Sequence, residues 1–301
     1  MGTTYMIKYS RSLLSTGQIQ KDINDILDII NNQMSTYQAD SEISIFNRMN
    51  AYLPFEISSN FYYVLEKSNY YYNLSEGIFD VTINQLSSLW GFDKKKPFKP
   101  SDNQIKNPLE LIGFNKIQLL QNNTILKTDN QIQLTLNAIA KGYALDEISN
   151  YLDNNNIENY MIEIGGEVKV KGNSVNGKKW IIGLSGFNND IDSIVKSISI
   201  TDAAVATSGD YRNFIIYDDL LYSHIINPST GYPADNKVVS ATVIANYCID
   251  ADALATILSI MSIEKSLELI NSLNNTECLI VERDEESFNY YYSKNMKKYI
   301  N

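Results

Sequence analysis

The chain has a single histidine, His224, and near its C-terminal end a carboxylate and a hydroxyl four residues apart, Asp252 and Thr256. An imidazole exchanges protons readily near neutral pH, so proton transfer in this chain is expected to run through His224. If residues 250–261 are helical, the Asp252 and Thr256 oxygens lie on one face. Such oxygens are ligands for a hard cation such as Mg²⁺, which in enzymes is also coordinated by substrate phosphates.

Each of these residues also has a purely structural interpretation. A lone histidine is more often a hydrogen-bonded part of the fold than a catalyst, and His224 would then brace the Pro/Gly turn at residues 228–231. Asp252 would cap its helix, and Thr256 would bond back to a backbone carbonyl. Taken alone, the residues leave both interpretations open.

Three further segments combine glycine or small residues with polar side chains. Residues 77–82 follow a predicted helix and place Asp80 in a strand or turn. Residues 136–144 open a helix with small residues and Lys141, so that its amide end can face a phosphate. The pair Gly165-Gly166 interrupts a strand, either as a bulge or where a ligand approaches the backbone.

Composition excludes several classes of partner. With 25 Lys and Arg against 35 Asp and Glu, the net charge of −10 argues against nucleic acid or an anionic membrane surface as a partner, whereas a single phosphate held by a metal and amides is compatible with it. Cys248 and Cys278 lie in apolar runs and are expected to be buried, not disulfide-bonded. No apolar run reaches the length of about eighteen residues that a membrane span needs.

The first residues alternate like a strand and lack the apolar core of a signal peptide, which predicts a cytoplasmic protein for the sequence as written. A chain trimmed of its leader would begin in the same way and would instead be anchored to a membrane outside the cytoplasm.

The elements that must position these groups mix helices and strands without a regular βαβ rhythm. We therefore predict an α+β fold with largely antiparallel sheets and packed helices, as a single domain over residues 1–301 that forms one compact unit of one or two lobes. Predicted helices cover 18–37, 58–75, 140–152, 250–261 and 263–273; predicted strands cover 1–9, 161–170, 180–184, 195–200, 214–217, 238–245, 278–283 and 288–292; residues 93–107 are predicted to be a polar loop, and a hairpin from residue 117 turns at Asn122-Asn123.

Eight segments, taken in order, resemble the FAD:protein FMN transferase family, often called ApbE. Any one of them is short enough to occur by chance, whereas eight in the same order are not. They span almost the whole chain, at residues 1–5, 34–47, 77–80, 139–144, 164–167, 207–211, 224–232 and 251–256.

The resemblance implies an enzyme that splits FAD and attaches its FMN half, through a phosphoester, to a threonine or serine of a partner flavoprotein, releasing AMP. This is covalent flavinylation, a post-translational modification, with FAD as the substrate. It implies that Mg²⁺ is held by the side chains of Asp252 and Thr256 and the backbone carbonyl of Ala138, while His224 takes the proton of the incoming hydroxyl. The residues implied to contact FAD are Met1, Tyr37, Ile78, Phe79, Asp80, Thr135, Lys141, Gly165, Gly166, Ser208 and Gly209.

The sequence departs from the family pattern at three places. Thr135 and Asn137 stand where the family often has aspartate and glycine, so the polar contacts of that loop differ, and Glu167 stands where it often has aspartate. The chain contains no acceptor segment of the Asp-(Gly/Ala)-x-(Ser/Thr)-x-Ala-Thr type, which implies that it modifies another protein.

Two other functions use the same residues. A Mg²⁺-dependent FAD pyrophosphatase would let water take the place of the protein hydroxyl and would produce FMN and AMP. A non-catalytic FAD-binding protein is the second alternative; the combination of His224 with the metal pair argues against it, because binding alone needs no proton acceptor.

Overall fold

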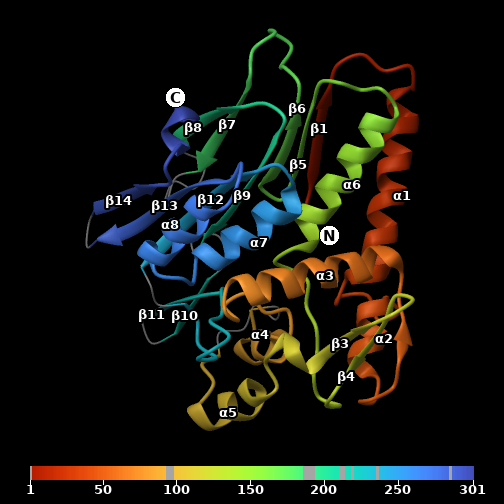
Figure 1. Ribbon diagram of the computed structural model, residues 1–301, viewed down its shortest axis with the longest axis vertical. Helices are drawn as coiled ribbons and strands as arrows, with labels where there is room; N and C mark the ends of the chain where they lie inside the picture. The colour runs from red at the N-terminus through yellow and green to blue at the C-terminus, as the bar shows by residue number, and fades with distance from the viewer. Residues whose placement is uncertain are drawn as a thin grey trace. The chain divides into compact units, whose positions relative to one another are not determined.

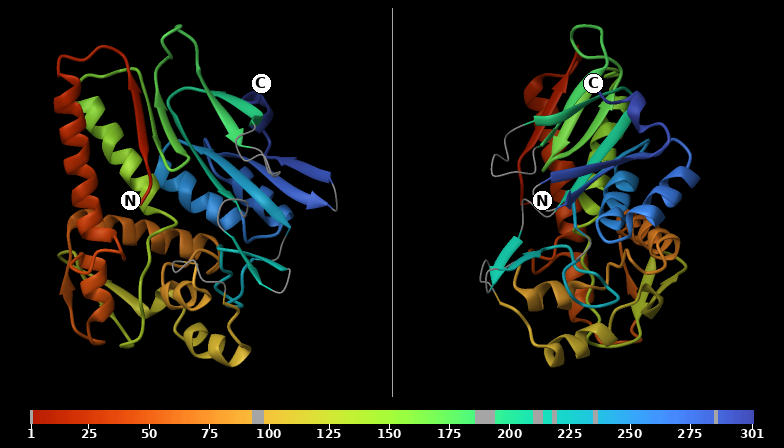
Figure 2. Two further views of the ribbon diagram at one scale, coloured as in Figure 1. Left: turned by 180° about the vertical axis from the view of Figure 1, so that it is seen from behind. Right: turned by 90° about the vertical axis from the view of Figure 1, so that its left-hand side faces the viewer.

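The computed structural model describes residues 2–92, 98–185, 194–209, 214–217, 220–234, 237–284 and 287–301. The chain divides into two compact units. The colours in Figure 1 and Figure 2 follow residue number, so the segments of each unit can be found with the bar. The first unit contains residues 1–27, 141–212 and 236–301, and the second contains residues 28–140 and 213–235. In the described part of the chain, no helix has both the length and the apolar character needed to cross a membrane.

A seven-stranded sheet forms the body of the first unit, with the strand order β1-β5-β6-β9-β12-β13-β14. Every neighbouring pair in it is antiparallel, which confirms the predicted α+β class. The strands are β1 (Tyr5–Tyr9), β5 (Tyr160–Ile164), β6 (Glu167–Lys171), β9 (Ala203–Gly209), β12 (Val238–Ala245), β13 (Glu277–Asp284) and β14 (Ser287–Tyr292).

Both faces of this sheet are covered. Helix α7 (Cys248–Leu258) packs on one face, over β9 and β12, and α8 (Ile263–Ser272) packs on β13 (Figure 1). The two-stranded ribbon of β7 (Trp180–Ser185) and β8 (Ile194–Ile200) covers the other face, where its apolar side chains join those of β6 and β13 in one buried cluster. Strand β12 is buried at every position as a result.

The second unit contains mainly helices and two small sheets. The three-stranded sheet has the order β2-β4-β3, and β10 pairs with β11 in a separate ribbon. Its elements are α2 (Glu42–Arg48), β2 (Phe55–Glu56), α3 (Ser59–Leu74), α4 (Asn84–Trp90), α5 (Asp102–Glu110), η1 (Phe114–Lys116), β3 (Ile117–Leu120), β4 (Thr124–Lys127), β10 (Phe214–Tyr217) and β11 (Leu220–Ser223). Helix α1 (Thr16–Met34) and helix α6 (Ala140–Asn154) carry the chain between the units, and η2 (Met296–Lys298) lies near the C-terminus.

The predicted loop at residues 93–107 is wrong in its C-terminal part, where α5 begins at Asp102. Ser101 and Gln104 form a capping box at the start of this helix, and Ile105 is buried against the core of the second unit. Such a box fixes a helix start even in a polar stretch. The three lysines at residues 94–96 lie outside the described residues.

The turn that follows His224 is held by its own contacts within the second unit. The fully buried Trp90 of α4 donates from Nε1 to the Gly231 carbonyl at 2.9 Å, and Asn227 Oδ1 accepts from the backbone and hydroxyl of Ser229. Gly231 has φ +76°, and a Cβ there would lie 2.5 Å from Ile105 Cγ2. The turn therefore requires glycine for both its conformation and its packing.

We expect Trp90→Phe to lower the free energy of unfolding by about 1–3 kcal/mol, because the buried Gly231 carbonyl loses its donor and a small void remains. Urea titration followed by circular dichroism measures the change. Tyr52→Phe, at a side chain that is 68% exposed, is the control and should change stability by less than about 0.5 kcal/mol. Equal stability of the two variants would contradict this role of Trp90.

Candidate functional site

Helices α6 and α7 meet closely at the first turn of α6, in the first unit. The backbone amide of Gly142 donates to Asp252 Oδ2 at 2.9 Å. A Cβ at residue 142 would lie 2.4 Å from the carbonyl oxygen of Cys248, which is backbone and cannot move aside. Only glycine therefore permits this approach, and the approach brings the Asp252 carboxylate to the amide end of α6.

Lys141 lies between two buried carboxylates. Its Nζ is 3.3 Å from Glu167 Oε1 and 3.9 Å from Asp252 Oδ1. Burial alone lowers the pKa of Lys141, but the charges of Asp252 and Glu167 outweigh it and hold this pKa above its usual range. The lysine is consequently a fixed positive charge, suited to an anionic ligand.

Glu167 presents an unused oxygen to this cluster. It is the first residue of β6, directly after the turn at Gly165 and Gly166, and it is only 5% exposed. Burial raises the pKa of Glu167, and the ion pair with Lys141 opposes that shift. Its Oε2 atom is buried without a hydrogen-bond partner. A buried acceptor without a donor is costly in an isolated fold, so this oxygen fits a ligand or cation.

The predicted metal ligands Asp252 and Thr256 lie one turn apart on α7, as expected from their spacing. The helix begins four residues before Asp252, at Cys248, so Asp252 does not cap its own helix as the structural interpretation required. Ala138 lies in the turn just before α6. In the described part of the chain, no three His, Cys, Asp or Glu side chains gather closely enough to hold a metal by themselves.

These residues fit Mg²⁺ and not a metal caged by protein alone. Mg²⁺ is commonly held by one or two carboxylates together with waters and substrate phosphates. The cluster offers the Asp252 carboxylate and the unpartnered Glu167 oxygen, and Thr256 follows Asp252 by one turn of α7; all three side chains carry hard oxygen ligands.

In the second unit, the segments that contain Asp80 and Thr135 lie next to each other. The Thr135 amide donates to the carbonyl of Val81 at 2.8 Å. Asp80 Oδ1 accepts from the amide and the hydroxyl of Thr82, whereas Asp80 Oδ2 and Thr135 Oγ1 are buried without partners. Burial raises the pKa of Asp80 to about 6, against the hydrogen bonds from Thr82. Two unpartnered buried polar atoms on hydrogen-bonded segments indicate a second region that could take polar ligand groups.

The remaining predicted residues of the second unit differ in exposure. Ile78 is half-buried and Phe79 is buried in the core, while the Tyr37 ring is 76% exposed and available for stacking. His224 directly follows β11 and is half-buried.

The predicted glycines of the first unit lie at strand ends. Gly165 and Gly166, with φ +59° and +104°, form the turn that joins β5 to β6, so they are a hairpin turn and not a bulge. Ser208 and Gly209 end β9, where they pair with Ala241 and Ser240 of β12. Met1 lies outside the described residues.

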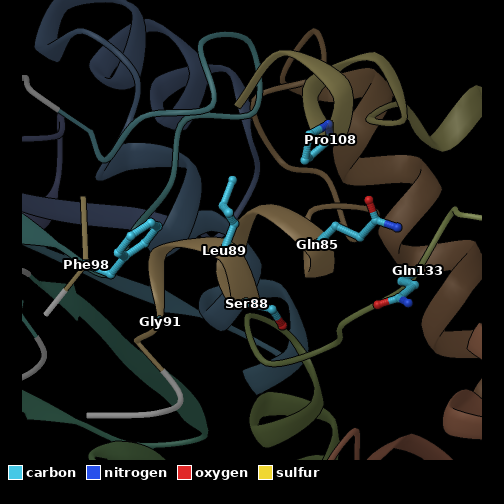
Figure 3. A pocket seen from close by; sticks show the side chains of 7 residues that line it. All are labelled: Gln85, Ser88, Leu89, Gly91, Phe98, Pro108 and Gln133. Carbon is cyan, nitrogen blue, oxygen red and sulfur yellow. The ribbon is translucent and has the colours of Figure 1, made fainter. Parts of the chain in front are cut away.

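A cavity of about 500 Å³ also lies in the second unit, beside α4 (Figure 3). The Gln85 and Gln133 amides lie to one side of it and the Phe98 ring to the other, with Leu89 between them. Its remaining lining residues are Ser88, Gly91 and Pro108. Among the residues that the structure describes, no charged side chain lines this cavity, and none of its lining residues is a predicted site residue.

The chain resembles known proteins over most of its length. A model of the ApbE family matches residues 1–280. The FAD:protein FMN transferase of Vibrio cholerae is 36% identical over 100% of this chain and 90% of its own length, and that of Haemophilus influenzae is 36% identical over 94% and 85%. The solved structure of the flavin transferase ApbE from V. cholerae superposes with a TM-score of 0.91 at 37% identity, covering 99% of this chain and 96% of that one. The flavinyl transferase ApbE of Pseudomonas stutzeri in its apo form gives 0.89 at 29% identity, covering 99% and 93%.

The chain belongs to the ApbE family. Among the residues of this ApbE member that sequence analysis did not select, Glu167 is the clearest candidate for the site. A signal existed in the sequence: a glutamate begins a strand directly after two glycines, and the next residue, Val168, is apolar. Its ion pair with Lys141, however, joins residues 26 positions apart and is visible only in the fold.

We expect Gly142→Ala to destabilise this ApbE-family protein by about 1–3 kcal/mol, because the new methyl group collides with the Cys248 carbonyl and forces α6 and α7 apart. Chemical unfolding measures the loss. Gly17→Ala in α1 is the matched control, since nothing lies within 4 Å of a Cβ there; the better helix former should leave stability unchanged or raise it by up to about 1 kcal/mol. A Gly142→Ala protein as stable as the wild type would disprove the close contact.

Proposed function

We infer that this chain is an FAD:protein FMN transferase, with FAD as its substrate and another protein as the acceptor. Relatives with that name match it over 90% and 85% of their own length, and the family match runs over residues 1–280, which supports a single functional domain. The observation that carries the chemistry is the buried cluster of Lys141, Glu167 and Asp252 at the amide end of α6.

The proposed reaction is a displacement at the FMN phosphorus of FAD. A threonine or serine hydroxyl of the acceptor forms the new oxygen–phosphorus bond, and the bond between that phosphorus and the oxygen bridging to AMP breaks. AMP leaves with that oxygen, and the hydroxyl proton passes to His224. A positioned imidazole suits this proton transfer, because a neutral hydroxyl is a weak nucleophile.

Asp252 and Thr256, with the Ala138 carbonyl, are the residues proposed to hold Mg²⁺. When bound, the ion neutralises charge on the pyrophosphate, which phosphoryl transfer requires. Lys141 adds a second positive charge at the same cluster, and its ion pairs with Glu167 and Asp252 keep its ammonium group in place. The ammonium group is therefore held in place before the substrate binds, which lowers the cost of reorganisation when charge develops.

Further residues are proposed to contact FAD. Asp80 and Thr135 offer unpartnered buried oxygens to polar groups of the substrate, and the exposed Tyr37 ring offers an aromatic surface to the flavin. The Ile78–Phe79 turn, Gly165, Gly166, Ser208, Gly209 and Met1 complete the proposed set.

Incubation with FAD, Mg²⁺ and an acceptor domain that carries an Asp-Gly-x-Thr-x-Ala-Thr segment should add one FMN to the acceptor, as read by intact-protein mass spectrometry. Asp252→Asn should lower the transfer by more than about 100-fold, since it removes the charged oxygen ligand. Asp250→Asn, on a different side of the same helix, is the control and should keep activity. Release of FMN and AMP with no labelled acceptor would instead favour the pyrophosphatase.

Loss of the imidazole should reduce transfer by about 10²- to 10⁴-fold while FAD still binds, because general-base assistance contributes that much. The measurement is in-gel flavin fluorescence of the acceptor with the His224→Ala and His224→Asn enzymes. Trp90→Phe is the control for the neighbouring turn, since it removes the Gly231 hydrogen bond and leaves the imidazole intact. Near-normal labelling by His224→Asn would exclude a role as base.

A further inference from the structure

Asp146 of α6 holds the start of the helix that carries the proposed metal ligands. Its two carboxylate oxygens accept one hydrogen bond each, Oδ1 from the Cys248 amide and Oδ2 from the Ile249 amide, both at 2.9 Å. These are the first two residues of α7, and the residue before them, Tyr247, makes no side-chain cap. A carboxylate from another helix thus supplies the cap that α7 lacks in its own sequence.

Lys169 of β6 ties this carboxylate to the sheet. Its Nζ is 3.4 Å from Asp146 Oδ1, and it also donates to the Asn246 carbonyl and lies 5.4 Å from the centre of the Tyr247 ring. The chain just before α7 is therefore fixed from two sides, by a helix and by a strand. Asp146 is only 8% exposed, which keeps water from competing for its oxygens.

We propose that Asp146 is a positioning residue for the proposed metal site: it sets where α7 presents Asp252 and Thr256 to Lys141, and touches none of the reacting atoms. Asp252 lies one turn beyond Cys248 on α7, so a shift or rotation at the start of the helix moves its carboxylate away from the Gly142 amide and from Lys141. The inference rests on the proposed transferase function and extends it to a residue outside the reacting cluster.

Asp146→Asn tests this role, because an amide keeps one acceptor oxygen but turns an NH₂ group toward the second backbone donor. We expect Mg²⁺ to bind the variant about 10- to 100-fold more weakly in a calorimetric titration with FAD present and acceptor withheld, as partners that orient metal ligands typically contribute that much. FAD binding without Mg²⁺ should be retained, and a high Mg²⁺ concentration should restore FMN transfer.

Asp153→Asn is the matched control. Asp153 lies on the same helix and pairs with a lysine of the same strand, Lys171, at 3.0 Å, but it accepts its hydrogen bond from the Tyr160 hydroxyl and not from an amide of α7. It should therefore leave Mg²⁺ binding unchanged even if it costs some stability. An Asp146→Asn protein that melts at a lower temperature but binds Mg²⁺ as the wild type does would show a purely structural role and overturn the proposal.

If Asp146→Asn does not fold, Lys169→Met provides a second test, since it removes the ion pair at 3.4 Å that holds the Asp146 carboxylate in place against the two α7 amides. Weaker Mg²⁺ binding by this variant supports the proposal, and wild-type binding refutes it. Absence of Mg²⁺ binding by the wild-type protein would refute the metal site itself, and so is distinct from a failure of the Asp146 role alone.

Discussion

The N-terminal turns of α6 and α7 each receive a carboxylate from the other helix, and the charged part of the first unit depends on this exchange. Asp252 of α7 accepts from the Gly142 amide of α6, while Asp146 of α6 accepts from the first two amides of α7. Each helix end gains a negative charge beside its positive dipole, and each carboxylate gains donors that offset the cost of burying it. The two contacts together fix both the separation and the rotation of the helices.

The exchange also explains why so much charge can be buried in one place. Three carboxylates, from Asp146, Glu167 and Asp252, face two ammonium groups, from Lys141 and Lys169, so the cluster is one positive charge short of neutrality when all are ionised. Backbone amides reduce this deficit for Asp146 and Asp252 but not for the unpartnered oxygen of Glu167. The ion pairs alone therefore do not neutralise the cluster, and the unpartnered Glu167 oxygen is the place where a further positive charge would be most favourable.

Sequence patterns predicted the elements whose side chains repeat with a clear period or favour β structure, and missed a strand of small residues and the shortest helices. The hairpin at Asn122-Asn123 and helices α6 and α7 are confirmed, although α7 begins two residues earlier than predicted because its cap comes from Asp146, more than 100 residues away in the chain. Strand β9 was missed because its small residues neither alternate nor favour β structure; it is a strand because α7 and its neighbours bury it. Helices α2 and α4 were missed as well, since seven residues are too few for a visible period.

For the candidate site, the sequence likewise predicted the local spacing of residues but not the contacts between distant segments. On α7, residues 248, 252 and 256 share one face, and on α6, residues 142 and 146 share another, so spacing alone places each set of contact residues on one side of its helix. Spacing alone cannot predict that the two faces pack against each other, because neither segment contains a pattern specific to the other. Gly142 is the one sequence signal of this packing. A glycine inside a helix lowers the stability of the helix, so its presence suggests that another backbone packs closely there, and in this structure that backbone is the first turn of α7. A glycine one residue after a lysine at a helix start, four residues before an aspartate, therefore points to a docked helix end as well as to a bound phosphate.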